Sequence, residues 1–464
     1  MKGSYKKSLF VFRRDLRLHD NSALIRALKQ SEHVLCLFVI DSVLLKPERQ
    51  AAIRFLYQSL VDLSLEIARQ GGELVVLQGR PCDCVTNVVR DEEIEAVFVN
   101  RDYSPYSQQR DGQIESALKN LSIPLIQQTD LLLTAPGEVM KKSGGGSYTV
   151  FTPFYHRARQ LVVPLPKPCP QNRLTKPQRV KGLQLKTCFE KRLKTKEAHP
   201  LTSKGGRNEA DILIAELQKL STYDKDRDFP AENLTSRLSA HIKFGTCSVR
   251  EVYHLIRKQF GEGHGLIRSL FWRDFFYQVA FFFPGVYRAA FRQQYNAIIW
   301  NSSSECFERW CKGLTGYPIV DAGMRELLAT GFMHNRVRMV TASFLVKHLG
   351  IDWRQGERWF MKNLIDFDPA VNNGNWQWVA STGCDAQPWF RIFNPWIQQK
   401  KFDPECRYIK QWVPELASLS PDKIHKIASM SVGFYPKPVV DHRLAVAETK
   451  LRYAVVNAQK LEHD

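Results

Sequence analysis

The sequence predicts two domains of different class: an N-terminal α/β domain with a doubly wound parallel sheet, and a larger all-α domain joined to it by a long connector. Three observations predict this. Short apolar runs alternate with an amphipathic stretch in residues 1–133, Pro, Gly and Lys are frequent in residues 134–207, and apolar residues recur at helical spacing in residues 208–464. A chain of 464 residues with 44% hydrophobic residues can bury the cores that such domains need.

The N-terminal part contains apolar runs of strand length, rich in Val, Ile, Leu and Phe, at residues 8–12, 34–41, 73–79, 96–103 and 123–130. Between them, residues 51–69 place Ile53, Leu56, Leu60, Leu63 and Ile67 on one face of a predicted helix. Strands that alternate with helices indicate a parallel sheet. Neither GxGxxG nor GxxxxGK[ST] occurs here, so no phosphate-binding motif indicates a ligand of this domain.

The middle and C-terminal parts differ in composition. Gly144, Gly145 and Gly146 are followed by prolines at 164, 166, 168, 170 and 177 among lysines, which favours a long exposed connector. From about residue 208, helical periodicity dominates, as in the set Val320, Met324, Leu327 and Leu328. We therefore expect residues 208–464 to form one helical domain.

The charge of the chain favours a polyanionic partner, with nucleic acid as the leading candidate. Lys and Arg number 66 against 47 Asp and Glu, a formal net charge of +19. Part of this surplus has a simpler explanation, which is a single solvated basic segment. Residues 157–207 contain 14 Lys and Arg against two Glu. The rest of the chain is therefore only mildly basic.

The sequence excludes other classes. No apolar stretch approaches the roughly 20 residues of a membrane-spanning helix, and the apolar run at 9–12 is too short for the core of a secretion signal. We therefore expect a soluble, cytoplasmic protein with no membrane partner. The ten cysteines are scattered without a CxxC pair or a Cys/His cluster at zinc spacing, so we expect reduced, mostly buried thiols and no metal site.

The densest group of aromatic, acidic and amide residues lies between residues 366 and 394. It contains Asp366, Asp368, Asn372, Trp376 and Trp378, followed by Asp385, Trp389, Arg391 and Asn394. Aromatic residues make up only 11% of the chain, so tryptophans this close to carboxylates and amides indicate a functional site rather than plain core.

This segment resembles the flavin-binding signature of the DNA photolyase and cryptochrome family, most like a class I cyclobutane pyrimidine dimer photolyase. Further segments resemble motifs of the same family in the same order, at residues 12–21, 223–239, 271–274, 315–325 and 334–339. The match covers nearly the whole chain apart from the connector. The resemblance implies FAD in the helical domain, damaged DNA as the partner, and an α/β domain of the antenna type.

The resemblance assigns FAD contacts to a set of mostly polar residues. Thr235, Ser236 and Ser239 offer hydroxyl and backbone N–H groups near a predicted helix start, where phosphate oxygens bind well. Without the resemblance, these residues would indicate an ordinary helix cap, and Arg338 with Asp366 an ordinary salt bridge. The full set of expected FAD contacts is Tyr223, Thr235, Ser236, Arg237, Leu238, Ser239, Trp272, Asn335, Arg338, Asp366, Asp368 and Asn372.

Asn372 matches the family position that faces flavin N5. An amide can accept or donate a hydrogen bond there but cannot titrate, so it cannot deliver a proton as a carboxylate can. This suits a flavin used as the reduced anion, and it resembles photolyases more than plant-type photoreceptors. Without the resemblance, Asn372 beside Asn373 would indicate a turn or a cap.

Trp376, Trp353 and Trp300 match three family positions that form an electron-hopping chain from the flavin to the surface. Indole is easily oxidised, so closely spaced indoles can refill a photoexcited flavin in short steps. With ten tryptophans in the chain, spacing alone would favour buried helix anchors. Because the other motifs are in register, we assign the three tryptophans, with Asn372, to the reaction.

The resemblance also assigns the DNA side. Trp272 and Trp378 would stack on a flipped pyrimidine pair, Met339 would add an apolar contact, and arginines would neutralise phosphates. The segment 334–336, His-Asn-Arg, lacks the paired histidines typical of enzymes for 6–4 photoproducts, which favours the cyclobutane lesion. The full set of expected DNA contacts is Arg227, Ser269, Trp272, Asn335, Arg336, Met339, Trp378 and Arg391.

One position departs from the family pattern. Pyrimidine dimer photolyases usually carry a glutamate three residues before the tryptophan that matches Trp272, and this chain has Ser269 there, preceded by Arg268. Serine has a shorter reach and cannot supply a carboxylic acid proton. Three alternatives stay open: a water takes the place of the acid, repair is impaired, or the lesion differs.

The sequence therefore predicts a carbon–carbon lyase that repairs cyclobutane pyrimidine dimers by electron transfer from light-excited reduced FAD. The alternatives are a blue-light flavin photoreceptor with weak or no repair, and a basic scaffold that only binds DNA. For an antenna chromophore, folate, deazaflavin, a second flavin and an empty pocket all fit. We expect a monomer, associated with the nucleoid in a prokaryote, and a nuclear location stays open.

Overall fold

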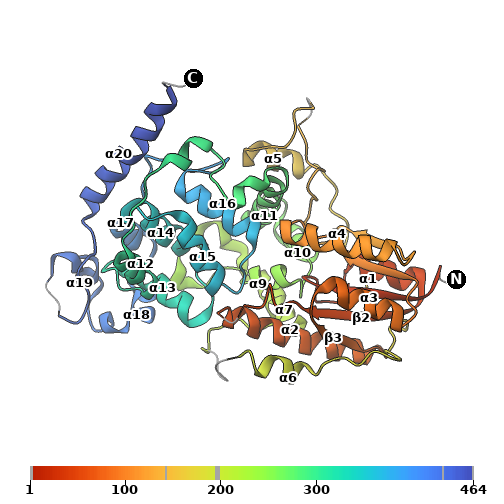
Figure 1. Ribbon diagram of the computed structural model, residues 1–464. Helices are drawn as coiled ribbons and strands as arrows, with labels where there is room; N and C mark the ends of the chain where they lie inside the picture. The colour runs from red at the N-terminus through yellow and green to blue at the C-terminus, as the bar shows by residue number, and fades with distance from the viewer. Residues whose placement is uncertain (1–3, 47, 142–143, 194–198, 431–432, 462–464) are drawn as a thin grey trace.

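The computed structural model describes residues 4–46, 48–141, 144–193, 199–430 and 433–461. An α/β part built around a single sheet lies beside a larger helical part (Figure 1). The fold class predicted from the sequence is confirmed.

The sheet has five parallel strands in the order β3-β2-β1-β4-β5. They are β1 (Tyr5–Phe12), β2 (Ser31–Ile40), β3 (Leu74–Gln78), β4 (Ala96–Asn100) and β5 (Leu125–Gln128). Each predicted apolar run forms one of these strands. The strand order reverses between β1 and β4, so the loop after β1 lies at a topological switch point on the carboxyl edge of the sheet.

Helices cover both faces of the sheet. α1 (Ser22–Gln30) and α2 (Gln50–Arg69) share a core with Phe10 and Phe12, whereas α3 (Pro81–Asp91) and α4 (Pro105–Lys119) share one with Leu9 and Val11. This division follows from the alternation of side chains along β1. The apolar residues predicted for one face of the helix at 51–69 are all buried.

The segment predicted as an exposed connector is partly packed. It contains α5 (Phe151–Ala158) and α6 (Leu185–Glu190). Leu174 forms an isolated bridge to Val34 of β2, and Leu174 and Phe189 are buried in the core on the α2 side of the sheet. The expectation of exposure is therefore wrong for this part, because its apolar side chains complete the sheet domain. The predicted boundaries at residues 133 and 207 stay a prediction.

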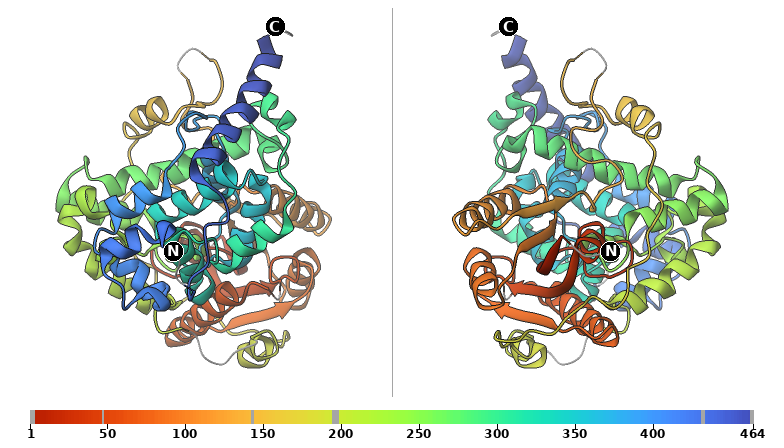
Figure 2. Two further views of the ribbon diagram at one scale, coloured as in Figure 1. Left: turned by 90° about the vertical axis from the view of Figure 1, so that its left-hand side faces the viewer. Right: turned by 90° about the vertical axis from the view of Figure 1, so that its right-hand side faces the viewer.

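The helical part supplies most of the remaining described residues. Its α-helices are α7 (Arg207–Glu216), α8 (Tyr223–Asp226), α9 (Ser239–Phe244), α10 (Val249–Phe260), α11 (Gly265–Phe282), α12 (Ser304–Lys312), α13 (Pro318–Thr330), α14 (Asn335–Ser343), α15 (Trp353–Asn363), α16 (Pro369–Ala380), α17 (Pro395–Phe402), α18 (Arg407–Trp412), α19 (Pro421–His425) and α20 (His442–Leu461). α20 projects away from the sheet (Figure 2). The predicted helical set 320–328 lies on α13, although Leu328 is 47% exposed and lies outside the core.

A buried ionic cluster joins the two parts. Arg250 of α10 binds Asp20 at 3.0 Å and Asp130 at 2.7 Å, and Arg17 binds Asp130 at 2.7 Å. Although burial opposes ionisation, Arg17 and Arg250 hold the pKa of Asp130 well below its usual value. The cluster fixes the loop after β1 against the helical part.

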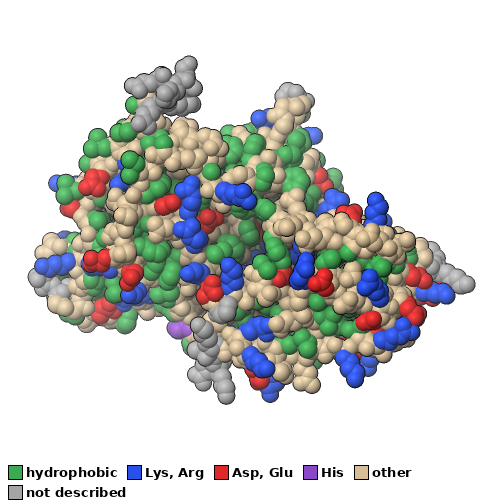
Figure 3. Space-filling view, in the orientation of Figure 1, with side chains coloured by type: hydrophobic (Ala, Val, Ile, Leu, Met, Phe, Trp, Pro, Cys, Tyr) green, Lys and Arg blue, Asp and Glu red, His purple; other side chains and the backbone are tan. Residues whose placement is uncertain are grey.

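The surface carries basic side chains on both parts of the molecule (Figure 3). Lys and Arg side chains are spread over both parts on the face shown in Figure 3, with several near the middle. Among the described helices, none is long and apolar enough to cross a membrane.

All ten cysteines are free. Cys36, Cys247, Cys311 and Cys406 are buried and the other six are half-buried, so the expectation of mostly buried thiols was too strong.

Candidate flavin site and DNA-binding face

The loop that ends at Ser239 lies against the ion pair that the sequence predicts. Arg338 of α14 donates two hydrogen bonds to Asp366, from Nη1 at 3.1 Å and from Nη2 at 2.9 Å. Ser239, the first residue of α9, donates from Oγ to the same carboxylate at 2.6 Å. Three segments far apart in the sequence therefore meet at Asp366.

The loop keeps its polar groups accessible. Arg237 has a φ of 52°, which turns the chain before α9. Thr235 and Ser236 are half-buried, so their hydroxyls can meet a ligand. Leu238 is fully buried in the helical core, and its FAD contact stays a prediction.

Cations line the same region. Arg237 and Arg338 lie 5.5 Å and 5.4 Å from the ring centroid of Phe332. Arg227 lies 5.7 Å from the ring centroid of Tyr223, which is buried. Hydroxyls and guanidinium groups suit a diphosphate, and the Arg338 ion pair offers both donors and acceptors for the polar edge of an isoalloxazine. The donor set therefore fits FAD.

Asp368, a predicted FAD contact, accepts hydrogen bonds from other residues of the protein on both of its carboxylate oxygens. Its Oδ1 accepts hydrogen bonds from two backbone N–H groups in the first turn of α16, at 3.1 Å and 3.2 Å. Its Oδ2 accepts hydrogen bonds from Arg14 and Tyr277. The carboxylate thus caps the helix that carries Asn372, and a direct contact with FAD stays a prediction.

Sequence reasoning missed the carboxyl group of Glu357, which is bound by Asn373, the residue after Asn372. Nδ2 of Asn372 donates to the backbone carbonyl of Glu357 at 3.2 Å, and Asn373 donates to the Glu357 carboxyl at 3.0 Å. Burial raises the pKa of Glu357 to about 7. Its place one helical turn after Trp353 on α15 could have indicated it. Glu357 can hold a proton near Asn372, which the amide itself cannot.

Of the three predicted tryptophans, Trp376 and Trp353 are buried, and Trp300, the one assigned to the surface end, is more exposed. Trp376 and Trp353 are 2% and 1% exposed, and Trp300 is half-buried. Trp376 is tightly packed, because a Cβ on Gly356 would lie 2.1 Å from its ring and the ring of Phe360 lies 5.0 Å away. An electron path through the three stays a prediction.

The lesion side of the predicted site begins on α11. Trp272 stacks face to face on Phe151 of α5, with ring centroids 3.7 Å apart. Ser269 donates from Oγ to the carbonyl of Gly265 at 3.1 Å, and Arg268 is exposed over the Phe151 ring. The hydroxyl at the family's glutamate position is therefore turned onto its own helix. No sequence pattern indicated Phe151, which lies far from Trp272 along the chain.

Two predicted DNA contacts on α14 are neighbours, and a third is already paired. Nδ2 of Asn335 lies 3.8 Å from Sδ of Met339. Arg336 forms an ion pair with Asp228 at 2.5 Å, and its guanidinium lies 4.4 Å from the ring centroid of Phe402. Arg336 is thus less free to meet a phosphate than the sequence suggests.

The remaining predicted contacts lie around the same helices. Trp378 is half-buried against the helical core, and Arg391 is exposed. In the part of the chain that the structure describes, Trp272 and Trp378 make no ring contact with each other. Their predicted clamp on a base pair therefore stays a prediction.

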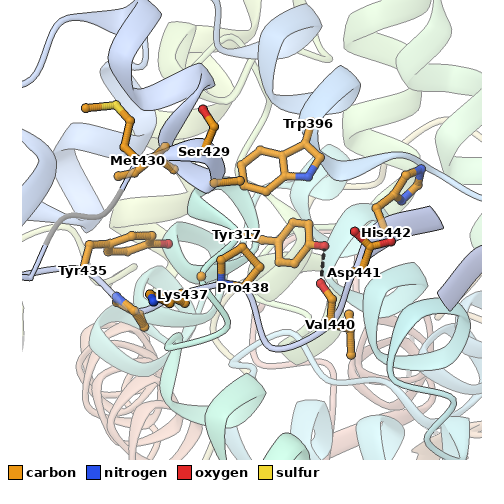
Figure 4. A pocket seen from close by; sticks show the side chains of 14 residues that line it. Tyr317, Trp396, Ser429, Met430, Tyr435, Lys437, Pro438, Val440, Asp441 and His442 are labelled. Atoms are coloured by element: carbon orange, nitrogen blue, oxygen red, sulfur yellow. Dashed lines mark hydrogen bonds between the residues drawn. The ribbon is translucent and has the colours of Figure 1, made fainter. Parts of the chain in front are cut away.

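A separate cavity of about 520 Å³ lies between the start of α13, α17 and residues 427–430 and 435–442 (Figure 4). Tyr317, Trp396 and Tyr435 line it. Its phenol groups are engaged within the protein, since Tyr317 donates to the carbonyl of Val440 at 2.8 Å and Tyr435 donates to Asp321. None of the predicted site residues lines this cavity.

Two family descriptions match the chain. The one for DNA photolyase matches residues 8–171, and the one for the FAD binding domain of DNA photolyase matches residues 266–455. Among curated relatives, a deoxyribodipyrimidine photo-lyase from Synechococcus sp. is 36% identical over 476 residues, which cover 97% of this chain and 97% of the relative.

Solved structures share the fold. An archaeal photolyase from Sulfolobus tokodaii with two FAD molecules has a TM-score of 0.85 and 38% identity, over 97% of this chain and 99% of that one. A bacterial class III photolyase from Agrobacterium tumefaciens has a TM-score of 0.90 and 35% identity, over 99% and 98%. A cryptochrome from Synechocystis sp. has a TM-score of 0.87 and 27% identity, over 97% and 99%.

The fold and the donor set define a flavoprotein of the photolyase and cryptochrome class. The chain belongs to the DNA photolyase family. Class I is not confirmed within that family, because a class III photolyase is among the matching structures.

Proposed function

We propose that the protein is a carbon–carbon lyase that uses blue light to repair cyclobutane pyrimidine dimers in DNA. The meeting of Ser239, Arg338 and Asp366 beside the accessible loop carries this proposal. Relatives named deoxyribodipyrimidine photo-lyase, 36%, 37% and 35% identical, support it. When bound, reduced FAD supplies the light-excited electron that splits the dimer and then takes it back.

The residues of the chain would bind FAD and orient it. Thr235, Ser236 and Arg237 would hold the diphosphate, because their donors are accessible on one loop. Asn372 would offer the isoalloxazine a hydrogen bond that does not change with pH. The carboxyl group of Glu357, whose pKa burial raises to about 7, is bound by the neighbouring Asn373. Asn372 is buried, so little water reaches it.

On the DNA side, stacking and charge would have separate roles. Trp272, backed by Phe151, would present its other face to a base, since aromatic stacking favours an unpaired base over a paired one. Arg391 would contact phosphate from its exposed position. Arg336 would contribute less, because Asp228 already neutralises it.

A flavin photoreceptor with weak or no repair is the second candidate, and one observation favours it. The Ser269 hydroxyl donates to Gly265 within α11 and offers no acidic proton to a lesion. A cryptochrome is also among the matching structures.

Repair of defined oligonucleotides separates these candidates. One substrate carries a thymine dimer and another a 6–4 photoproduct, and the protein is fully reduced beforehand. We expect blue light, but not darkness, to split the thymine dimer into two thymines and to leave the 6–4 photoproduct unchanged. Repair of neither lesion by protein that holds FAD would favour the photoreceptor, and repair of the 6–4 product alone would replace the lesion class.

We further propose a second chromophore in the α/β part, since the Sulfolobus tokodaii relative contains two FAD molecules. Folate and deazaflavin differ from flavin in absorption, so a spectrum of the purified protein identifies either of them. The ratio of FAD to protein separates a second flavin from FAD alone. We also propose a monomer that acts where the DNA is, which is the nucleoid in a prokaryotic cytoplasm and the nucleus in a eukaryote.

A further inference from the structure

Arg14 belongs to the α/β part, yet its side chain ends among groups of the helical part. It lies in the loop after β1 and forms an ion pair with Asp368 at the start of α16. Its Nε donates to the backbone carbonyl of Lys243 on α9 at 3.2 Å, and its Nη1 lies 3.5 Å from Asp102. The side chains of Arg14 and Asp368 are only 18% and 6% exposed, so water screens the pair weakly.

Asp368 uses its two oxygens for different purposes. Oδ1 caps the first turn of α16, and Oδ2 accepts from Arg14 and Tyr277. Although burial opposes ionisation, Arg14 and Arg273 hold the pKa of Asp368 below its usual value. Without Arg14 the buried carboxylate would lose its closest cation, which weakens its hold on α16.

The backbone around Arg14 is also fixed to this region. The N–H of Leu16 donates to the carbonyl of Phe244, at the end of α9, at 3.2 Å. Gly245 has a φ of 71°, and a Cβ on it would lie 2.2 Å from the carbonyl oxygen of Arg14. Only glycine permits this close approach, so the loop after β1 cannot shift without moving α9.

We infer that Arg14 is a positioning residue for the flavin site, which acts from the α/β part by fixing α9 and the start of α16. α9 begins with Ser239, next to the loop that would hold the diphosphate, and α16 carries Asn372 and Trp376. One side chain thus sets the relative placement of two elements that would contact different ends of FAD. The inference rests on the proposed function, because it takes FAD as the ligand of these elements.

The test compares FAD binding by the native protein, Arg14→Gln and Arg14→Lys. Arg14→Gln should raise the FAD dissociation constant about tenfold, a typical size for coupling between sites, and change the visible absorption band of bound FAD. Arg14→Lys keeps the charge but not the planar fork, so it should lose less. These readouts need neither light nor DNA, so a native protein that fails to repair would overturn the proposed function without deciding this inference.

Arg13→Gln is the matched control. Arg13 lies in the same loop, but its partners are Asp111 and the carbonyl of Asn100, both in the α/β part. Its substitution should leave FAD affinity unchanged. In an Asp368→Asn background, Arg14→Gln should cost less than it does in the native protein, because only the contacts with the Lys243 carbonyl and Asp102 are then left to lose.

Equal losses of FAD affinity in Arg13→Gln and Arg14→Gln would overturn the inference, as would a full additional loss from Arg14→Gln in the Asp368→Asn background. Circular dichroism shows whether each variant folds. If Arg14→Gln does not fold, Arg14→Lys carries the test, because one ammonium cannot serve both Asp368 and the Lys243 carbonyl in the same way. Native affinity and an unchanged spectrum in Arg14→Lys would then overturn the inference.

Discussion

At the scale of single residues, two carboxylates organise the proposed flavin site. Asp366 accepts from Arg338 and Ser239, and Asp368 accepts from Arg14, Tyr277 and the first turn of α16. Removal of one partner from a buried, paired carboxylate costs more than the intact pair contributes. Substitutions of the aromatic and titratable residues around them test single roles in the proposed site.

Trp376→Phe should block blue-light photoreduction of oxidised FAD while FAD stays bound. Phenylalanine keeps an aromatic ring beside Phe360, although it lacks the outer indole atoms that pack on Gly356, and it is much harder to oxidise than indole. The measurement is the bleaching of FAD absorption under blue light with a thiol as external donor. Trp412→Phe, a buried tryptophan outside the proposed path, should bleach as the native protein does. Undiminished bleaching in Trp376→Phe would show that electrons take another path.

Glu357 should lower the stability of the protein as the pH rises from 5 to 8. The pKa of Glu357 in the folded protein is about 7, above that of an exposed glutamate, so the folded state binds this proton more tightly than the unfolded chain. Its stabilisation is therefore largely present at pH 5 and is lost as the pH rises through about 7. Glu357→Gln cannot ionise and should be more stable than the native protein at pH 8, by up to about 3 kcal/mol.

Urea unfolding at pH 5 and pH 8 measures this effect. Burial also raises the pKa of Asp274 to about 7, but Asp274 is present in both proteins, so the difference between them isolates Glu357. Equal stability of the variant and the native protein at pH 8 would contradict the assignment.

Ser269→Glu should raise repair per absorbed photon. A carboxylic acid at this position would form a strong hydrogen bond to a base that gains negative charge, and such bonds are about twice as strong as neutral ones. Arg268 is exposed and lies over Phe151, so it has a partner other than the new acid. The measurement is thymine-dimer splitting under limiting blue light. Ser269→Gln, which has the length but not the acid, should gain less, and equal gains would contradict the argument.

At the scale of elements, α15 and α16 approach closely because of a glycine. A Cβ on Gly356 would lie 2.1 Å from the ring of Trp376 and 2.6 Å from the side chain of Leu345. Gly356→Ala should therefore lower the free energy of unfolding by about 1–3 kcal/mol, and displace Trp376 enough to slow photoreduction. Gly112→Ala on the exposed side of α4 meets nothing within 4 Å and should not destabilise the protein. Denaturant unfolding decides between them, and equal stability of both variants would contradict this packing.

The elements show which features the sequence could predict. The five strands and α2 follow from local patterns, because an apolar run or a helical face is visible in the residues themselves. The pairs Arg14 with Asp368 and Phe151 with Trp272 join distant segments, and no local pattern contains them. The packing of Leu174 was missed for the same reason, since its partner strand lies far earlier in the chain.

At the scale of the whole molecule, the α/β and helical parts form a continuous structure joined by buried charges. Arg250 and Arg17 connect them through Asp20 and Asp130, and Arg14 connects the sheet to α16. The sequence motifs indicated that both parts exist and what class they belong to. They did not indicate that one loop, after β1, makes both connections.

DNA binding should depend strongly on salt, because exposed arginines displace counterions from phosphates. Arg391→Gln should weaken the binding of damaged and of undamaged DNA by similar factors. It should also reduce the slope of log affinity against log salt concentration by about one unit. Arg336→Gln should reduce it less, because Arg336 is paired with Asp228. Titration of labelled DNA at several salt concentrations measures both slopes. A salt-independent affinity would contradict a DNA-binding role.

Recovery of thymine absorbance during illumination tests the central claim most directly. Dimer splitting restores the base double bonds, so the ultraviolet absorbance of a dimer-containing oligothymidine rises as repair proceeds. With reduced, FAD-loaded protein, we predict that the absorbance rises in blue light, stops rising in darkness and resumes on illumination. No rise in blue light, with FAD bound and reduced and the oligonucleotide bound, would contradict light-driven repair by this protein.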